Sequence, residues 1–192
     1  MWYRIMQKRK KRGERKRAET AAPMELAARA LQAFIAAGTI EVSLDRLAAQ
    51  VGISKRMLVH YFGDRETLEE RAMTLLEERL RAQFAPGTFP KGAPARAVVK
   101  ALWERTTAPQ NRNMLRLIMD LSRRAWNGSA RARKFYAEQQ GLWVVMLLPV
   151  FSSERVVEEF LQMFQGTVLV YLVSGDASAG WRALDAFLGR VA

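Results

Sequence analysis

The sequence predicts an all-α protein. Apolar residues recur three and four positions apart from residue 26 to residue 191, the spacing that places them on one face of a helix. The alternation of apolar and polar residues that marks a half-buried strand is absent. Serine or proline precedes several of these apolar stripes and glycine follows them, as at the beginnings and ends of helices. We therefore expect a small N-terminal helical domain followed by a larger one.

The composition limits the chemistry that the chain can perform. The chain has 192 residues, 49% of them hydrophobic, and can bury one core or two small ones. It has no cysteine and one histidine, which leaves no thiol nucleophile and little material for a metal site or a Ser-His-Asp triad. A phosphate-binding glycine loop is also missing. We expect no enzyme activity, no metal and no cofactor.

The N-terminal segment is strongly basic. The chain carries a net charge of +12, and residues 1–17 hold nine Lys and Arg side chains against one Glu. Like charges in such a run repel one another, so we expect residues 1–19 to be a disordered arm. The arm could lie against DNA phosphates or remain a solvated tail. Contact with an anionic membrane surface is a weaker third reading.

The sequence gives no sign of membrane insertion or export. No apolar run reaches the roughly 18 residues of a spanning helix. The N-terminus lacks the apolar core of a signal peptide. We expect a cytoplasmic protein.

Residues 42–62 predict two short helices joined at a glycine. Ser43 can cap the first helix and Ser54 the second, because a serine oxygen accepts hydrogen bonds from the first turn. Gly52 stands where a chain leaves a helix with positive φ. The inward residues of the second helix are expected to be Met57, Leu58, Tyr61 and Phe62. The pattern fits a helix-turn-helix, whose second helix lies in the DNA major groove, or a plain helical hairpin.

A further helix precedes this pair. Pro23 can start it, and it ends before Gly38. Its apolar face consists of Leu26, Ala30, Leu31, Phe34 and Ile35. We expect it to pack across the pair and to complete a three-helix domain over residues 20–65, which binds DNA if the pair is a helix-turn-helix.

The helix pair also carries a family pattern. The matching residues are Ser43, Leu47-Ala48, Gly52-Ile53-Ser54-Lys55, Leu58, Tyr61-Phe62, Asp64-Arg65-Glu66 and Leu68. In this register the segment resembles the DNA-binding domain of TetR-family transcriptional regulators. The resemblance implies a homodimer whose last two helices form a four-helix bundle with those of the partner. It also implies that the second domain binds an inducer.

The same resemblance implies contacts with the DNA backbone. Ser43, Tyr61 and Arg65 fall at positions where phosphate contacts are usual. Lys55 falls where a phosphate or a base edge is contacted. Phosphate contacts of this kind set the register on the duplex without reading its sequence.

Four residues depart from the commonest family string. Arg56 replaces a small residue and can reach the O6 and N7 atoms of guanine. Met57 and Val59 replace residues that often contact DNA, and His60 is expected to face the groove or solvent. The complete set expected at the DNA is Ser43, Ser54, Lys55, Arg56, Met57, Val59, His60, Tyr61 and Arg65.

Residues 66–192 are expected to form the ligand-binding and dimerisation domain. A long helix over 65–84, which Asp64 or alternatively Thr67 can cap, links it to the first domain. Its glutamates are expected outside: Glu66, Glu69, Glu70, Glu77 and Glu78. The Pro- and Gly-rich segment 85–92 follows, and a helix opens at Pro94. Further helices are separated by breaks at Ala108-Pro109, Asn127-Gly128-Ser129, Pro149 and Ser174-Gly175-Asp176. Asp120 is expected in a surface ion pair with a neighbouring arginine.

The last two helices are apolar over wide stripes. We expect a homodimer through roughly residues 153–190, since two recognition helices must meet two DNA half-sites. The alternative is that these stripes only close the core of a monomer.

The middle of the second domain is rich in aromatic and methionine residues. Such residues at helical spacing usually form a core, yet small-molecule sites are also mostly apolar clefts with a few polar groups. Gln139 is the main polar candidate because it lies on an apolar helix face, with Thr106 and Tyr171 weaker. The residues expected to line a ligand pocket are Trp103, Phe135, Gln139, Trp143, Met146, Phe160, Phe164 and Thr167.

Together these features predict a ligand-responsive transcriptional regulator. We expect a repressor that a small apolar effector releases from a palindromic operator in double-stranded DNA. The alternative is a helical protein-interaction module without DNA binding. The identity of the effector and of the operator is not contained in the sequence.

Overall fold

The computed structural model describes residues 23–84, 92–151 and 153–191, and these residues form helices and no strand. The chain divides into two compact units. Unit 1 comprises the residues up to Ala33 together with Glu41–Leu76. Unit 2 comprises Phe34–Ile40 and the residues from Glu77 onward. The all-α prediction is confirmed. The basic arm 1–19 and all but Gly92 of the Pro- and Gly-rich segment lie outside the described residues.

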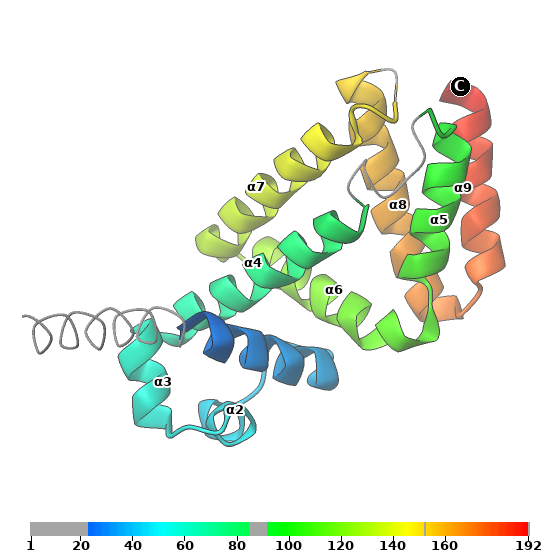
Figure 1. The fold of residues 1–192 in the computed structure, drawn as a ribbon. Coiled ribbons are helices and arrows are strands. Elements are labelled where there is room, and N and C mark those ends of the chain that lie inside the picture. The colour runs from blue at the N-terminus through cyan, green and yellow to red at the C-terminus, as the bar shows by residue number, and fades with distance from the viewer. Residues whose placement is uncertain (1–22, 85–91, 152, 192) are drawn as a thin grey trace, which may run out of the picture. The chain divides into compact units, whose positions relative to one another are not determined.

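Unit 1 contains the three predicted helices and the beginning of a fourth. The first helix covers 23–37, followed by α2 (Leu44–Val51), α3 (Lys55–Phe62) and α4 (Arg65–Phe84) (Figure 1). The core of the unit is formed by fully buried apolar side chains of all four helices: Ala30, Leu31, Leu47, Val51, Leu58, Leu68 and Ala72. A small apolar core of this kind fixes the α2–α3 pair on the first helix.

Helix α4 belongs to both units. Its residues as far as Leu76 are part of unit 1, and Glu77 is its first residue in unit 2. The predicted domain boundary at 65/66 marks the beginning of this helix, whereas the compact units meet within it. The end of the first helix is likewise assigned to unit 2, as part of Phe34–Ile40.

Unit 2 is a helical bundle. Its elements after α4 are α5 (Ala95–Thr106), η2 (Pro109–Asn111), α6 (Arg112–Trp126), α7 (Ala130–Leu147), α8 (Glu154–Ser174) and α9 (Ala177–Val191). Helices α8 and α9 pack together, α5 packs on α9, and α6, α7 and α8 pack on one another (Figure 1). Ser129 is the N-cap of α7 and Ser153 the N-cap of α8. Gly175 is the C-cap of α8, with a φ of 76°.

Helix α8 is long and apolar enough to cross a membrane by length and composition alone. No apolar run of that kind was expected from the sequence. A core helix of a folded domain passes the same test, and Val157, Phe160 and Leu161 of α8 are buried in the core of unit 2. One helix of this kind is weak evidence for a membrane protein.

Candidate functional site

The α2–α3 pair is fixed by capping bonds close in sequence. The Ser43 Oγ accepts from the backbone N–H of Arg46 at 3.3 Å, and the Ser54 Oγ accepts from that of Met57 at 3.2 Å. Between the helices, Gly52 has a φ of 84°, a left-handed conformation that a residue with a side chain rarely adopts. The predicted caps and the glycine turn are therefore confirmed.

Helix α3 has one buried and one exposed side. Leu58 and Phe62 are buried. The residues on the exposed side include the predicted DNA-contacting ones: Lys55, Arg56, Met57, Val59 and His60. Met57 was also predicted to point inward, and this is wrong, because 39% of it is exposed. The buried face of α3 is set by Leu58 and Phe62, four residues apart, and Met57 is turned about 100° from Leu58, at the edge of that face.

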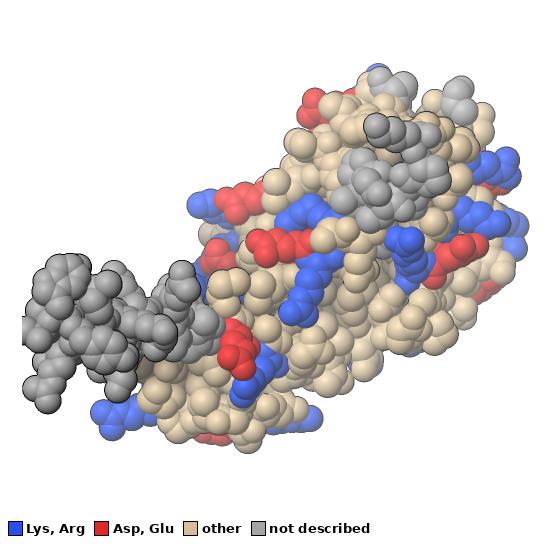
Figure 2. All heavy atoms as spheres, viewed as in Figure 1, with Lys and Arg blue, Asp and Glu red and all other residues tan. Residues whose placement is uncertain are grey.

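The surface around α3 carries basic side chains. The Lys55 Nζ lies 3.1 Å from a carboxylate oxygen of Asp45, and both side chains are more than half exposed. Exposed pairs of this kind contribute little to stability and are exchanged readily. Figure 2 shows Lys and Arg side chains at the surface beside α3. The beginning of α3 thus offers positive charge that is held only by an exposed ion pair.

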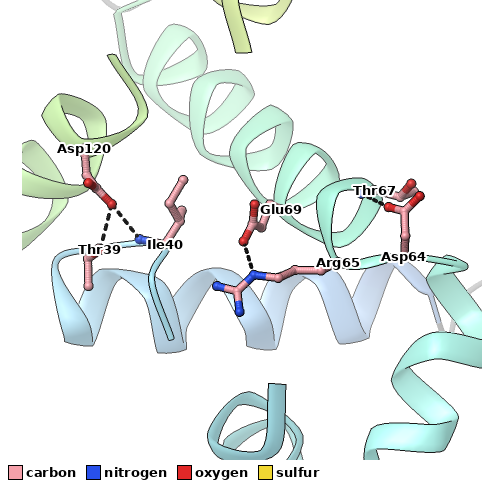
Figure 3. Close-up of polar contacts among 7 residues, drawn as sticks. All are labelled: Thr39, Ile40, Asp64, Arg65, Thr67, Glu69 and Asp120. Carbon is pink, nitrogen blue, oxygen red and sulfur yellow. Dashed lines mark hydrogen bonds and ion pairs between the residues drawn. The ribbon is translucent and has the colours of Figure 1, made fainter. Parts of the chain in front are cut away.

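The beginning of α4 is held by two polar contacts (Figure 3). Asp64 accepts from the backbone N–H of Thr67 at 2.6 Å and caps the helix, as predicted. The Arg65 Nε donates to Glu69 at 2.6 Å. The Glu69 side chain is only 7% exposed, although it was predicted to lie outside. The ion pair with Arg65 one turn earlier stabilises the buried carboxylate, and it also orients the Arg65 guanidinium.

Unit 2 contains a mostly apolar cavity of about 140 Å³. Its lining comes from α4, α5, α6, α7 and α8 and includes five of the eight residues predicted for a ligand pocket: Phe135, Gln139, Trp143, Phe160 and Phe164. Met114, Ile118 and Leu80 also line it and were not singled out. These residues are ordinary members of apolar stripes, and only the packing of the helices distinguishes them.

The other three predicted pocket residues lie outside this lining. The Trp103 Nε1 donates to the backbone oxygen of Ala177 at 2.9 Å, and the Thr167 hydroxyl donates to that of Met163 at 2.7 Å. Met146 packs against the core of the unit. Their polar groups, where they have any, are bonded to the backbone.

One part of the cavity lining is polar. Gln139 is 8% exposed, and its Oε1 accepts from an Arg81 nitrogen at 2.6 Å. The same nitrogen lies 3.6 Å from the Glu77 Oε2, which accepts from the Trp143 Nε1 at 2.9 Å. Arg81, Glu77, Gln139 and Trp143 thus form one connected group, here named the polar cluster.

Glu77 was predicted to lie on the outside of its helix, and this is wrong. Its side chain is 13% exposed and lines the cavity. Burial raises the pKa of Glu77, and the hydrogen bond from Trp143 and the charge of Arg81 only partly offset this effect. Arg81, four residues later, is a local sign that Glu77 forms an ion pair. The hydrogen-bond donor Trp143 is 66 residues away and gives no such local sign.

A second partly buried carboxylate, that of Asp120, lies on α6. One oxygen of Asp120 accepts from the Thr39 hydroxyl at 2.7 Å and from the Ile40 N–H at 3.1 Å, all within unit 2 (Figure 3). The other accepts from Arg123 at 2.9 Å. Burial raises the pKa of Asp120, but the hydrogen bonds from Thr39, Arg123 and Ile40 outweigh it, so the pKa is lowered. The predicted arginine pair is present, yet the residue is 13% exposed and holds a distant loop.

The comparisons with known proteins agree with this geometry. Residues 26–72 match the family model of bacterial regulatory proteins, tetR family. The sequence matches no curated protein.

The fold of nearly the whole chain occurs in solved regulators. A transcriptional regulator from Rhodococcus sp. Rha1 superposes with a TM-score of 0.73 at 17% identity, covering 88% of this chain and 95% of its own. A tetR-family transcriptional regulator from Streptomyces coelicolor gives a TM-score of 0.71 at 22% identity, covering 86% and 78%. These two likenesses establish the fold. Residues 26–72 are thus similar to the helix-turn-helix domain of the tetR family, and the fold of the chain is that of these solved regulators.

Proposed function

We propose that this protein is a cytoplasmic repressor that leaves a palindromic operator when a small, mainly apolar molecule enters the cavity of unit 2. The observation that carries the proposal is that one chain has both an exposed basic helix α3 and a mostly apolar cavity with a polar cluster. Cavities of this character are where proteins take small molecules.

The DNA contacts follow from the exposed side of α3. Lys55, Ser43, Tyr61 and Arg65 contact phosphates and set the register on the duplex. Arg56 lies exposed in the first turn of α3, next to the Ser54 cap. It reads a guanine through a bidentate hydrogen bond in the major groove.

The two half-sites of the operator are met by two copies of the chain. Helix α8 exposes a run of large apolar residues, with Leu169 53%, Val170 58% and Val173 82% exposed. On α9, the small residues Ala183 and Ala186 are exposed. Paired with the same helices of a second copy, these faces form a four-helix interface within residues 153–190. The resulting two-fold symmetry suits half-sites about 34–36 Å apart.

Ligand binding is coupled to DNA binding through an equilibrium between two arrangements of the helices. A ligand that fits one arrangement of α5–α8 better shifts the population toward it. Helix α4 supplies Glu77 and Leu80 to the cavity and also forms part of unit 1. Its displacement changes the spacing of the two recognition helices.

The proposal is tested by measuring binding to duplexes selected from genomic DNA. Arg56→Ala is expected to lose about 1–3 kcal/mol of discrimination at one base position. Lys55→Ala serves as the matched control. It is expected to weaken binding to all duplexes alike and to reduce the slope of log affinity against log salt concentration by about one. Equal losses on every duplex for Arg56→Ala would remove the base-reading role.

Two further measurements test whether the chain is a dimer and whether it binds DNA at all. Light scattering is expected to give twice the mass of the chain, and a monomer at micromolar concentration would contradict the dimer. Absence of salt-sensitive binding to any duplex would leave the helix pair as a protein-binding module instead.

A further inference from the structure

The cavity of unit 2 is small. Its volume is about 140 Å³, and most of its lining is apolar, including Leu102, Leu115, Phe135 and Phe160. An engineered apolar cavity of roughly 150 Å³ holds one benzene molecule. A ligand of about one aromatic ring, or of similar bulk, therefore fits this space without rearrangement of the core.

Gln139 presents a hydrogen-bond donor to this space. The bond from Arg81 to the Gln139 Oε1 fixes the orientation of the amide, so the Nε2 group points elsewhere. Gln139 lines the cavity and is 92% buried, and its Nε2 has no hydrogen-bond partner among the described residues. A ligand atom in the cavity that accepts a hydrogen bond gives this donor a partner.

Glu77 presents the complementary oxygen. Its Oε2 accepts from Trp143, whereas its Oε1 has no hydrogen bond within the described part of the chain. Both Glu77 and Gln139 are bound to the same Arg81 nitrogen, at 3.6 Å and 2.6 Å, so they lie at one end of the cavity. The raised pKa of Glu77 makes its protonated form more accessible. A hydroxyl group suits both forms, because it can donate to a carboxylate or accept from a carboxylic acid.

The charges at this end balance. Arg81 and Glu77 have opposite charges 3.6 Å apart. A cationic ligand is attracted by Glu77 but repelled by Arg81. An anionic ligand is attracted by Arg81 but repelled by Glu77. Either ion must also lose its hydration in a mostly apolar cavity, which costs several kcal/mol. The polar cluster therefore favours an uncharged ligand.

We propose that the effector is a small uncharged molecule, about one ring in bulk, with a single hydroxyl group bound between the Gln139 amide and the Glu77 carboxyl group. This inference rests on the proposed function for its link to DNA. The ligand's apolar body fills the remainder of the cavity. A small phenol or a compact alcohol belongs to this class.

Calorimetric titration of the full chain with four probes tests the ligand class. Phenol is expected to bind about tenfold more tightly than benzene, which lacks the hydroxyl group. Benzoate and benzylammonium are expected to bind more weakly than phenol. Benzene binding as tightly as phenol, tighter binding of either ion, or no binding of any probe would each overturn the proposal. This comparison uses the natural chain and does not depend on a variant folding.

Two variants locate the hydroxyl group. Gln139→Leu is expected to lower phenol affinity about tenfold and to leave benzene affinity unchanged. Thr106→Val is the matched control, because the Thr106 hydroxyl also lines the cavity without a hydrogen bond within the described residues. It is expected to leave phenol affinity unchanged. A loss with Thr106→Val and none with Gln139→Leu would contradict the assignment.

Duplex binding measured with and without phenol separates the two proposals. Phenol binding that follows this pattern but leaves DNA affinity unchanged refutes the ligand-responsive function and keeps the ligand class. Salt-sensitive DNA binding by a chain that prefers benzene or an ion to phenol refutes only the ligand class.

Discussion

The helix-turn-helix region of unit 1 and the helical bundle of unit 2 hold their polar groups in different ways. Ser43, Ser54 and Asp64 each accept from a backbone N–H three residues ahead. Gln139 and Asp120 are bonded to groups 58 and 81 residues away. The first region therefore depends on short segments of sequence, and its functional side chains can change without loss of structure. In the second region the polar groups hold the fold through distant bonds, and Gln139, which we propose to bind a ligand, is one of them.

The largest expected effect is the loss of a long-range bond. Asp120→Ala removes the acceptor of the Thr39 hydroxyl and the Ile40 N–H and the partner of Arg123. We expect the free energy of unfolding to fall by about 3 kcal/mol, measured by urea denaturation. Asp45→Ala is the matched control, because its exposed pair with Lys55 contributes less than about 1 kcal/mol. Similar losses for the two variants would break the contrast between the regions.

A local cap is expected to contribute less. Ser54→Ala removes the acceptor for the Met57 N–H at the start of α3 and should lower the free energy of unfolding by about 1 kcal/mol. Ser178→Ala, at an exposed serine of α9, provides the control and should change it by less than about 0.5 kcal/mol. A Ser54→Ala loss as large as that of Asp120→Ala would show that unit 1 also depends on distant contacts.

The smallest expected effect distinguishes the carboxylates of Glu77 and Asp120 by the sign of the pH dependence of stability. The pKa of Glu77 is raised above 4.5, so the natural chain loses stability as the pH rises from that value through the folded-state pKa. The pKa of Asp120 is lowered below 3.8, so its contribution is present above 3.8 and is lost as the pH falls through the folded-state pKa. Relative to the natural chain, Glu77→Gln should gain stability with rising pH and Asp120→Asn should lose it. Denaturation curves at several pH values from acid to neutral measure the free energy of unfolding of both variants. A change of the same sign in both variants would refute the opposite pKa shifts of Glu77 and Asp120.

The same contrast explains what could be predicted from the sequence. The caps at Ser43, Ser54 and Asp64 and the turn at Gly52 depend on neighbours within a few residues, and these predictions are confirmed. The helices of unit 2 were also predicted, because their apolar stripes and the breaks between them are local features.

The errors concern contacts between distant residues. Glu69 and Glu77 were predicted to be exposed because charged residues usually are, and only the folded chain shows their burial beside Arg65 and Trp143. The polar cluster could not be predicted as a group, because its members come from α4 and α7. Gln139 alone was singled out, since a glutamine on an apolar face requires a partner.

Helix α4 has a consequence for attempts to divide the protein. The border between the compact units falls between Leu76 and Glu77, inside 20 residues of unbroken helix. A chain cut there would leave four carbonyl groups without donors on one fragment and four N–H groups without acceptors on the other. Adding a single residue at that border would turn one half of the helix by about 100° against the other. Fragments meant to carry either activity alone should therefore keep the whole of Arg65–Phe84.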